Sequence, residues 1–189
     1  MTPTARPVPA SLVLVPVVVV TGSESTGKTT LAATLARHYH TAWVSEFARQ
    51  YLDEKVASTG RPLDASDVEP IAHGQIAAED RGRAAARGIA VLDTDLVSTM
   101  VYARHYYGSC PPWIEAAVRA RLGDLYLLCD IDVPWVAAPQ RDRPHARSHM
   151  HELFVAALES LGARYVTIRG SWAERQAAAV AAVDTLVPP

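Results

Sequence analysis

Hydrophobic residues along the chain alternate between short unbroken runs and longer stretches with helical spacing. The first run, Val13–Val20, consists of valine and leucine apart from Pro16. Such a run is typical of a central parallel strand that is covered on both faces. Because proline lacks the amide hydrogen that a strand donates, the regular strand should begin after Pro16. Apolar residues then recur at helical spacing and predict a helix over residues 27–39.

The same alternation continues to the end of the chain, and we expect Gly88 and Gly123 to end two of the later helices. A regular alternation of strands and helices predicts an α/β fold, with a parallel sheet and helices on both of its faces. The expected strands are 42–44, 89–92, 125–129 and 165–168, and the expected helices are 46–52, 71–87, 95–107, 113–122, 149–161 and 173–186.

Length and composition fit one globular domain. The chain has 189 residues, of which 49% are hydrophobic and 20% are charged. We expect a poorly ordered, Pro-rich tail over residues 1–10 and a single domain over residues 11–189. The formal net charge is -2 and no long basic stretch is present, which argues against nucleic acid as a partner.

Two further features concern the surroundings of the protein. The apolar run near the N-terminus is too short to span a bilayer, so no membrane partner is expected. The two cysteines do not form a C-x-x-C pair, and we expect two free thiols in a reducing cytoplasm. The sequence leaves the oligomeric state open.

The segment between the first strand and the first helix, Gly22–Thr29, reads GSESTGKT and matches the phosphate-loop pattern G-x-x-x-x-G-K-[ST]. Its glycines permit backbone angles that turn amide groups toward a phosphate. The helix that follows adds the positive end of its dipole. The chain is therefore predicted to be a single P-loop NTPase domain, whose nucleotide-binding residues here are Gly22, Ser25, Thr26, Gly27, Lys28, Thr29 and Thr30.

Three side chains of this loop have separate predicted roles. Lys28 should reach the β and γ phosphates, the Thr29 hydroxyl should coordinate Mg2+, and Thr30 should reach the α phosphate. The Asn-Lys-x-Asp sequence with which small GTPases read guanine is absent from the chain. Its absence favours ATP or a loosely selective nucleotide site, and with the Thr29 hydroxyl as a metal ligand we expect ATP and Mg2+ as the cofactors.

Two acids follow the predicted strand 89–92, in the sequence Asp93-Thr94-Asp95. Ligands of open α/β sheets bind at the carboxyl ends of the strands. An acid there can hold Mg2+ or accept the proton of an attacking hydroxyl. We expect Asp93 to bind the metal and either acid to be the catalytic base, while Asp95 is equally well explained as the N-cap of the next helix.

The segment 134–147 is rich in proline and arginine and lacks periodicity. It is either a solvated loop or a mobile lid, and beside a phosphate loop the lid is the better interpretation. Arg141 and Arg147 would then neutralise charge in the transition state. Glu46 and Arg49 form either a surface ion pair or part of the site for the phosphate acceptor.

Taken together, these segments resemble the ribosylnicotinamide kinase domain of NadR-type proteins, within the AAA-like group of P-loop ATPases and kinases. The resemblance covers roughly residues 17–186. Besides the phosphate loop it rests on Trp43–Arg49 followed by Tyr51-Leu52, on Gln75, on Asp93-Thr94-Asp95 with Ser98-Thr99, and on Asp132–Val136 followed by Arg141 and Arg147.

The resemblance implies transfer of the γ-phosphoryl group of ATP to the 5′-hydroxyl of a nucleoside, nicotinamide riboside, to give the mononucleotide. It departs from the family at residues 136–140, where Val-Ala-Ala-Pro-Gln replaces acids and a glycine. A P-loop module that binds or hydrolyses ATP for regulation, or a kinase for another nucleoside, stays open as an alternative. The roles implied are binding of the riboside by Trp43, Glu46, Arg49 and Trp135, an adenine pocket at Trp172, and catalysis by Lys28, Asp93 or Asp95, and Arg141.

Overall fold

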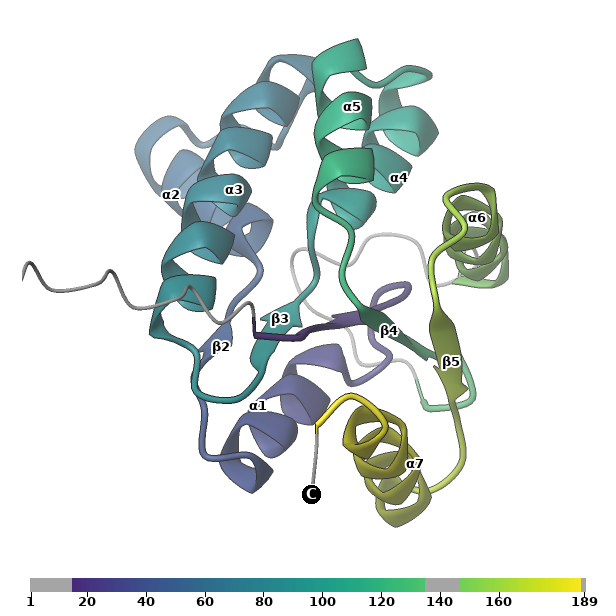
Figure 1. Cartoon of the computed structure of the whole chain (residues 1–189). Helices are drawn as coiled ribbons and strands as arrows, with labels where there is room; N and C mark the ends of the chain where they lie inside the picture. The colour runs from purple at the N-terminus through teal and green to yellow at the C-terminus, as the bar shows by residue number, and fades with distance from the viewer. Residues whose placement is uncertain (1–14, 135–146, 188–189) are drawn as a thin grey trace, which may run out of the picture.

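The computed structural model describes residues 15–134 and 147–187, and within them five parallel strands form one sheet in the order β2-β3-β1-β4-β5 (Figure 1). From β1 the chain crosses to the edge strand β2, returns through β3 and then passes to β4 on the other side of β1. This reversal opens a crevice at the carboxyl ends of the central strands. The strands are β1 Val17–Thr21, β2 Trp43–Val44, β3 Ala90–Asp93, β4 Leu125–Cys129 and β5 Tyr165–Ile168.

Helices cover both faces of the sheet, as the sequence predicts. On one face α1 and α7 pack side by side, and on the other lie α3, α4, α5 and α6, with α2 packed against α3 (Figure 1). The helices are α1 Lys28–His38, α2 Phe47–Thr59, α3 Val68–Ala85, α4 Leu96–Tyr107, α5 Pro112–Ala120, α6 Arg147–Ser160 and α7 Trp172–Asp184, and a 3-10 turn η1 spans Ala65–Asp67.

The central strand β1 shows why its sequence is valine without interruption. All five of its residues are buried. Val18 and Val20 belong to the hydrophobic cluster under α1 and α7, whereas Val17 and Val19 belong to the cluster on the opposite face. A strand that is covered on both faces has no polar side, so every position is apolar. The strand begins directly after Pro16, as predicted.

Two predicted helix ends are wrong. Helix α3 ends at Ala85 because Ala86 is already extended, and Gly88 lies in a turn beyond it. Helix α5 ends at Ala120, before Gly123. A Cβ atom at Gly123 would lie 2.7 Å from the side chain of Val19, so this glycine permits close packing onto β1.

Other features follow the sequence with small shifts or lie outside the described residues. Helix α2 runs to Thr59, seven residues past its predicted end. The cysteines are free, Cys129 buried and Cys110 half-buried. Among the described residues no helix is long and apolar enough to cross a membrane. The expected tail over residues 1–10 and all but the two end residues of the expected lid over residues 134–147 lie outside the part that the structure describes.

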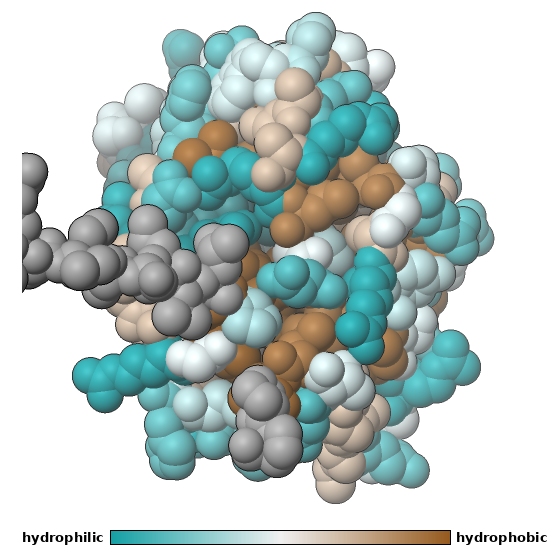
Figure 2. Space-filling model, viewed as in Figure 1, coloured by the Kyte–Doolittle hydropathy of each residue, from teal (hydrophilic) through white to brown (hydrophobic). Residues whose placement is uncertain are grey.

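Figure 2 shows one face of the molecule, on which hydrophobic residues gather near the middle among hydrophilic ones.

Of the described residues, four large hydrophobic side chains are exposed: Val56, Tyr106, Tyr107 and Trp172. The first three line one cavity between α2 and α4. Large exposed apolar groups around a cavity are typical of a binding site.

Candidate active site

The phosphate loop follows β1 and holds three residues in the left-handed backbone region: Gly22, Ser25 and Gly27. Gly22 has φ of 128°, and a Cβ atom there would lie 2.8 Å from the carbonyl oxygen of Cys129. Only glycine fits at this position, because any side chain would collide with the backbone of β4. Gly27 is the N-cap of α1 and makes no side-chain cap. The loop therefore has the backbone shape that the sequence predicts for an anion site.

Lys28 and Thr26 stabilise the loop from within. Lys28 Nζ donates to the carbonyl oxygen of Ser23 at 2.8 Å, and the Thr26 hydroxyl donates to the same oxygen at 2.9 Å. The Lys28 side chain is only 9% exposed and lines the cavity between α2 and α4. Its positive charge therefore lies between the loop and this cavity.

Thr29 and Asp93 meet at the carboxyl end of the central strands. The Thr29 hydroxyl donates to Asp93 Oδ2 at 2.6 Å. Asp93 is 1% exposed, and among the described residues its Oδ1 has no hydrogen-bond partner. Burial raises the pKa of this carboxyl, and the Thr29 hydrogen bond opposes that effect. A hydroxyl and a carboxylate with an unsatisfied oxygen are ligands that Mg2+ prefers, so the pair fits this metal.

Asp95 lies two residues further on but has different surroundings. It is the N-cap of α4, where its Oδ1 accepts from the Val97 amide at 3.0 Å. Its Oδ2 accepts from the Tyr126 hydroxyl at 2.6 Å. Burial raises its pKa to about 6. Asp95 is not among the residues that line the cavity. Of the two roles that the sequence leaves open, the structure shows the N-cap.

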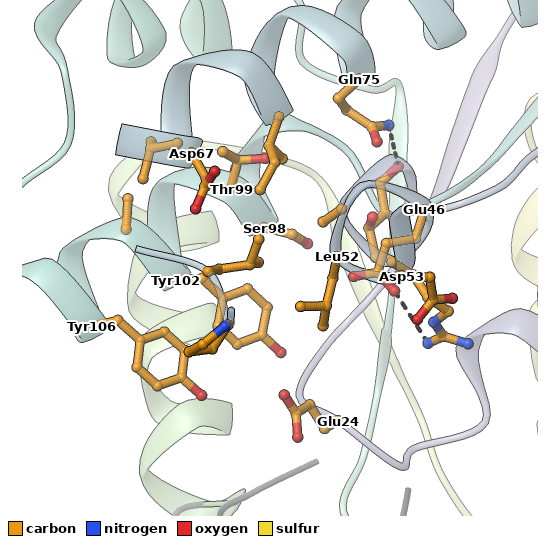
Figure 3. A pocket seen from close by; sticks show the side chains of 18 of the residues that line it. Glu24, Glu46, Leu52, Asp53, Asp67, Gln75, Ser98, Thr99, Tyr102 and Tyr106 are labelled. Atoms are coloured by element: carbon orange, nitrogen blue, oxygen red, sulfur yellow. Dashed lines mark hydrogen bonds and ion pairs between the residues drawn. The ribbon is translucent and has the colours of Figure 1, made fainter. Parts of the chain in front are cut away.

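A cavity of about 1100 Å³ opens beside the phosphate loop, between α2, η1 and α4 (Figure 3). Glu46 and Arg49, at the start of α2, both line it and form an ion pair at 3.2 Å. Tyr102 and Tyr106 line it from α4, across from Glu46 and Asp53 (Figure 3). Its charged lining residues, among those described, are five acids and two bases, namely Glu24, Glu46, Asp53, Asp64, Asp67, Lys28 and Arg49.

Two acids of this cavity act on the hydroxyl of Tyr102. Burial raises its pKa, and the charges of Glu46 and Glu24 raise it further. In Figure 3 the Tyr102 hydroxyl and the Glu24 carboxylate are directed toward each other. Glu24 comes from the phosphate loop, so the loop contributes an acid to the cavity as well as a lysine. The cavity is therefore both aromatic and acidic.

Gln75 connects the start of α2 to the strand end that carries the acids. Its Oε1 accepts from the Phe47 amide at 3.1 Å, and its Nε2 donates to the Thr94 carbonyl at 3.4 Å. It is 2% exposed and lines the cavity. Next to it, a Cβ atom at Gly74 would lie 2.0 Å from the Phe47 ring, so α3 approaches α2 as closely as glycine permits.

Two of the remaining predicted site residues, Arg147 and Trp172, lie beside the phosphate loop. Arg147 donates to the carbonyl oxygens of Ser25 at 3.3 Å and Val133 at 2.9 Å, beside the phosphate loop. Trp172 is 40% exposed, and its ring lies against Gly27. Thr30 is exposed on α1. Trp135 and Arg141 lie outside the described residues.

Trp43 is placed away from the cavity. In a strand, successive side chains point to opposite faces of the sheet. Val44 packs against the cluster on the α3 side, so Trp43 faces the other way and packs against the cluster under α1 and α7. It is partly buried and is not among the residues that line the cavity, so we assign it a packing role against this cluster.

Arg175 is the main residue that the sequence did not reveal. It is 1% exposed and donates to the Thr26 carbonyl oxygen at 3.2 Å, behind the phosphate loop. It lies in an alanine-rich helix with no recognisable pattern around it. The sequence offered only the residue type as an indication of this role, because an arginine that is buried needs hydrogen-bond or charge partners.

Comparisons with known proteins agree with this geometry. The family model described as AAA domain matches residues 17–175. The trifunctional NAD biosynthesis/regulator protein NadR of Escherichia coli (strain K12) is 30% identical over 153 residues, which make up 80% of this chain and 37% of NadR. NadR of Salmonella typhimurium is 29% identical over 154 residues, 80% of this chain and 38% of that protein. The chain thus spans less than two-fifths of the length of these relatives.

Several solved structures share the fold of this chain. A crystal structure of NadR in complex with NR has a TM-score of 0.77 at 26% identity, covering 93% of this chain and 52% of that chain. NadR in complex with NAD and AMP-PNP has a TM-score of 0.74 at 28% identity, covering 92% and 49%. Thymidylate kinase from Candida albicans shares the fold alone, with a TM-score of 0.68 at 12% identity and coverage of 90% and 92%.

Proposed function

The chain belongs to the AAA domain family of P-loop proteins, and on that premise we propose that it is an ATP-dependent kinase of nicotinamide riboside. The observation that carries the proposal is the position of Lys28, which belongs to the phosphate loop and also lines an aromatic, acidic cavity. A donor phosphate and an acceptor nucleoside held on the two sides of this lysine would be close enough to react.

The donor side consists of the phosphate loop and the end of β3. The amides at the start of α1 and the Lys28 ammonium would hold the β and γ phosphates of ATP. Thr29 and Asp93 would hold Mg2+, which neutralises charge on the phosphates when it is bound. The orphaned Asp93 Oδ1 supports this assignment, because a buried carboxylate oxygen without a partner is costly. Trp172 lies at the loop, where it would contact the nucleotide.

The transfer itself needs a base and a positioned hydroxyl. In the proposed step the acceptor 5′-oxygen forms a bond to the γ-phosphorus, and the bond from that phosphorus to the β–γ bridging oxygen breaks. Asp93 accepts the proton of the hydroxyl, and ADP leaves. Asp93 is the carboxylate that contacts the phosphate loop, through the Thr29 hydroxyl, and this position places it beside the transferred phosphoryl group. Asp95 is occupied by Tyr126 and by the α4 amide, so we assign it a structural role.

The charge of the cavity supports a cationic acceptor. Nicotinamide riboside carries a positively charged aromatic ring, and an excess of acids with three tyrosines suits such a ring. One solved NadR structure contains NR, which we take as the riboside. Glu24, Glu46 and Asp53 line the cavity and would supply negative charge in place of the acids that the sequence lacks after Trp135.

The proposal is tested by phosphoryl transfer from ATP to a panel of nucleosides that includes nicotinamide riboside, its uncharged reduced form, uridine and thymidine. We expect transfer to nicotinamide riboside in preference to the neutral nucleosides, and its loss in Lys28→Ala. The matched control is Arg104→Ala, since Arg104 pairs with Glu115 and neither residue lines the cavity or contacts the phosphate loop. Binding of ADP without transfer to any nucleoside would contradict the kinase and favour an ATP-binding regulatory module.

A further inference from the structure

The buried guanidinium of Arg175 joins three separate segments of the chain. Besides the Thr26 carbonyl of the phosphate loop, it donates to the Gly170 carbonyl at 3.1 Å and to the Asp130 carbonyl at 3.1 Å. It also forms an ion pair with Asp132. The segments are the phosphate loop, the end of β4 and the turn from β5 into α7. An arginine with 1% exposure is tolerated only because its donors are engaged in this way.

The contact with Thr26 fixes the direction of one peptide group in the loop. In a trans peptide the carbonyl and the following amide point in opposite directions. Because Arg175 holds the Thr26 carbonyl on one side of the loop, the Gly27 amide is turned to the other side. Arg147 holds the preceding carbonyl, that of Ser25, in the same manner. Two consecutive peptides are thus oriented by arginines, and oriented amides are what an anion site requires.

Arg175 also fixes the element that brings Trp172 to the loop. Both residues lie in the first turn of α7, whose N-cap Ser171 is held by a capping box with Glu174. The bond from Arg175 to the Gly170 carbonyl anchors the turn before the helix. The Trp172 ring lies against Gly27, whose amide belongs to the peptide that Arg175 holds. One side chain therefore positions both the phosphate loop and the tryptophan beside it.

We propose that Arg175 is a positioning residue for nucleotide binding, which orients the Thr26–Gly27 peptide of the phosphate loop and fixes Trp172 beside it. The inference rests on the proposed use of ATP as phosphate donor. Arg175 does not touch the acceptor cavity, since it is not among the residues that line it. Its loss therefore acts on nucleotide affinity and leaves acceptor affinity unchanged, whereas a general loss of stability would not separate the two.

The test compares Arg175→Gln and Arg175→Lys with the unaltered chain and with a matched control, Arg121→Gln. Arg121 is also mostly buried and makes ion pairs with Glu79 and Asp80, but it does not contact the phosphate loop. The measurements are the Kd for ADP by calorimetry, the separate KM values for ATP and nicotinamide riboside, and the Tm.

For Arg175→Gln we expect the Kd for ADP and the KM for ATP to rise by about tenfold or more, since several charge-assisted hydrogen bonds are lost. The KM for the riboside should change by less than about threefold. Arg175→Lys should fall between, because lysine keeps the charge but lacks the planar fork. Arg121→Gln should lower the Tm and leave the Kd for ADP unchanged.

A lowered Tm with an unchanged Kd for ADP in Arg175→Gln would overturn the inference and leave Arg175 a purely structural residue. If Arg175→Gln does not fold, Arg175→Lys decides in the same way, and an ADP affinity equal to that of the unaltered chain overturns the proposal. Failure of the proposed function has a different signature, because the unaltered chain would then bind ADP without phosphorylating nicotinamide riboside. The ADP affinities of the variants would still decide the role of Arg175.

Discussion

Replacing Glu79 with glutamine should stabilise the folded protein, and the gain should grow as the pH rises. Glu79 lies on α3 with 1% of its surface exposed, and burial raises its pKa from 4.5 to about 7, with the charge of Asp95 as the second cause. Arg121 and Arg83 lie 3.4 and 3.9 Å from its Oε2, and Gln75 donates at 3.2 Å. These contacts do not compensate for the lost hydration of the charge.

The sign and size of the effect follow from this pKa. A carboxyl with a higher pKa in the folded than in the unfolded chain binds its proton more tightly when folded. The free energy of unfolding therefore falls as the pH rises from 4.5 to about 7, and the loss is complete above that range. It amounts to about 3 kcal/mol near pH 8 and about 1 kcal/mol near pH 5. Glutamine has nearly the same shape and cannot ionise, so it removes this cost.

The assay is urea unfolding followed by circular dichroism at several pH values from about 5 to 8, for the unaltered chain and Glu79→Gln. The difference in unfolding free energy should widen with pH in favour of the variant. The control is Glu69→Gln, the same substitution at an exposed position on α3. A variant that is less stable than the unaltered chain at the highest pH would refute the reasoning, since the ion pairs with the arginines would then outweigh desolvation.

Two further predictions concern the reaction. Asp93→Asn should lower kcat for phosphoryl transfer by about a hundredfold or more, because the amide cannot accept the proton. ADP should still bind to this variant when no metal is added. A kcat within a few-fold of that of the unaltered chain would exclude Asp93 as the base. Gln75→Met removes the acceptor for the Phe47 amide and should raise the KM for the riboside by about tenfold with the KM for ATP unchanged. Equal increases in both KM values would instead indicate a general loss of structure.

The parts that could be predicted from the sequence are those set by local chemistry. Within about twenty residues the chain contains the valine run, the glycine loop and the helix after it, in the order that a phosphate loop requires. The structure confirms this order. The short run before Asp93 likewise predicts a buried strand that ends at an acid. The ends of helices are harder to predict from the sequence, because a glycine can end a helix or permit close packing. At Gly123 it permits packing against Val19.

The parts that could not be predicted depend on partners far away in the chain. Arg175 contacts the Thr26 carbonyl 149 positions earlier, and Gln75 contacts the Phe47 amide 28 positions earlier. No local pattern encodes a bond to a backbone carbonyl of another segment. Trp43 illustrates the same limit, since the face of the sheet that a two-residue strand presents depends on its register with β3.

The single residue between Asp93 and Asp95 gives the two acids different surroundings. Thr94 has φ of 68°, an uncommon value for a β-branched residue, and its amide donates to the Val20 carbonyl at 2.9 Å. This left-handed residue ends β3 and turns the chain, so the two carboxylates do not share a face as residues i and i+2 of a strand would. Asp93 faces Thr29 and keeps one oxygen without a hydrogen-bond partner among the described residues, while Asp95 turns into the core to cap α4. The strained conformation at Thr94 therefore gives the two acids different surroundings, and the proposed chemical role falls to Asp93 alone.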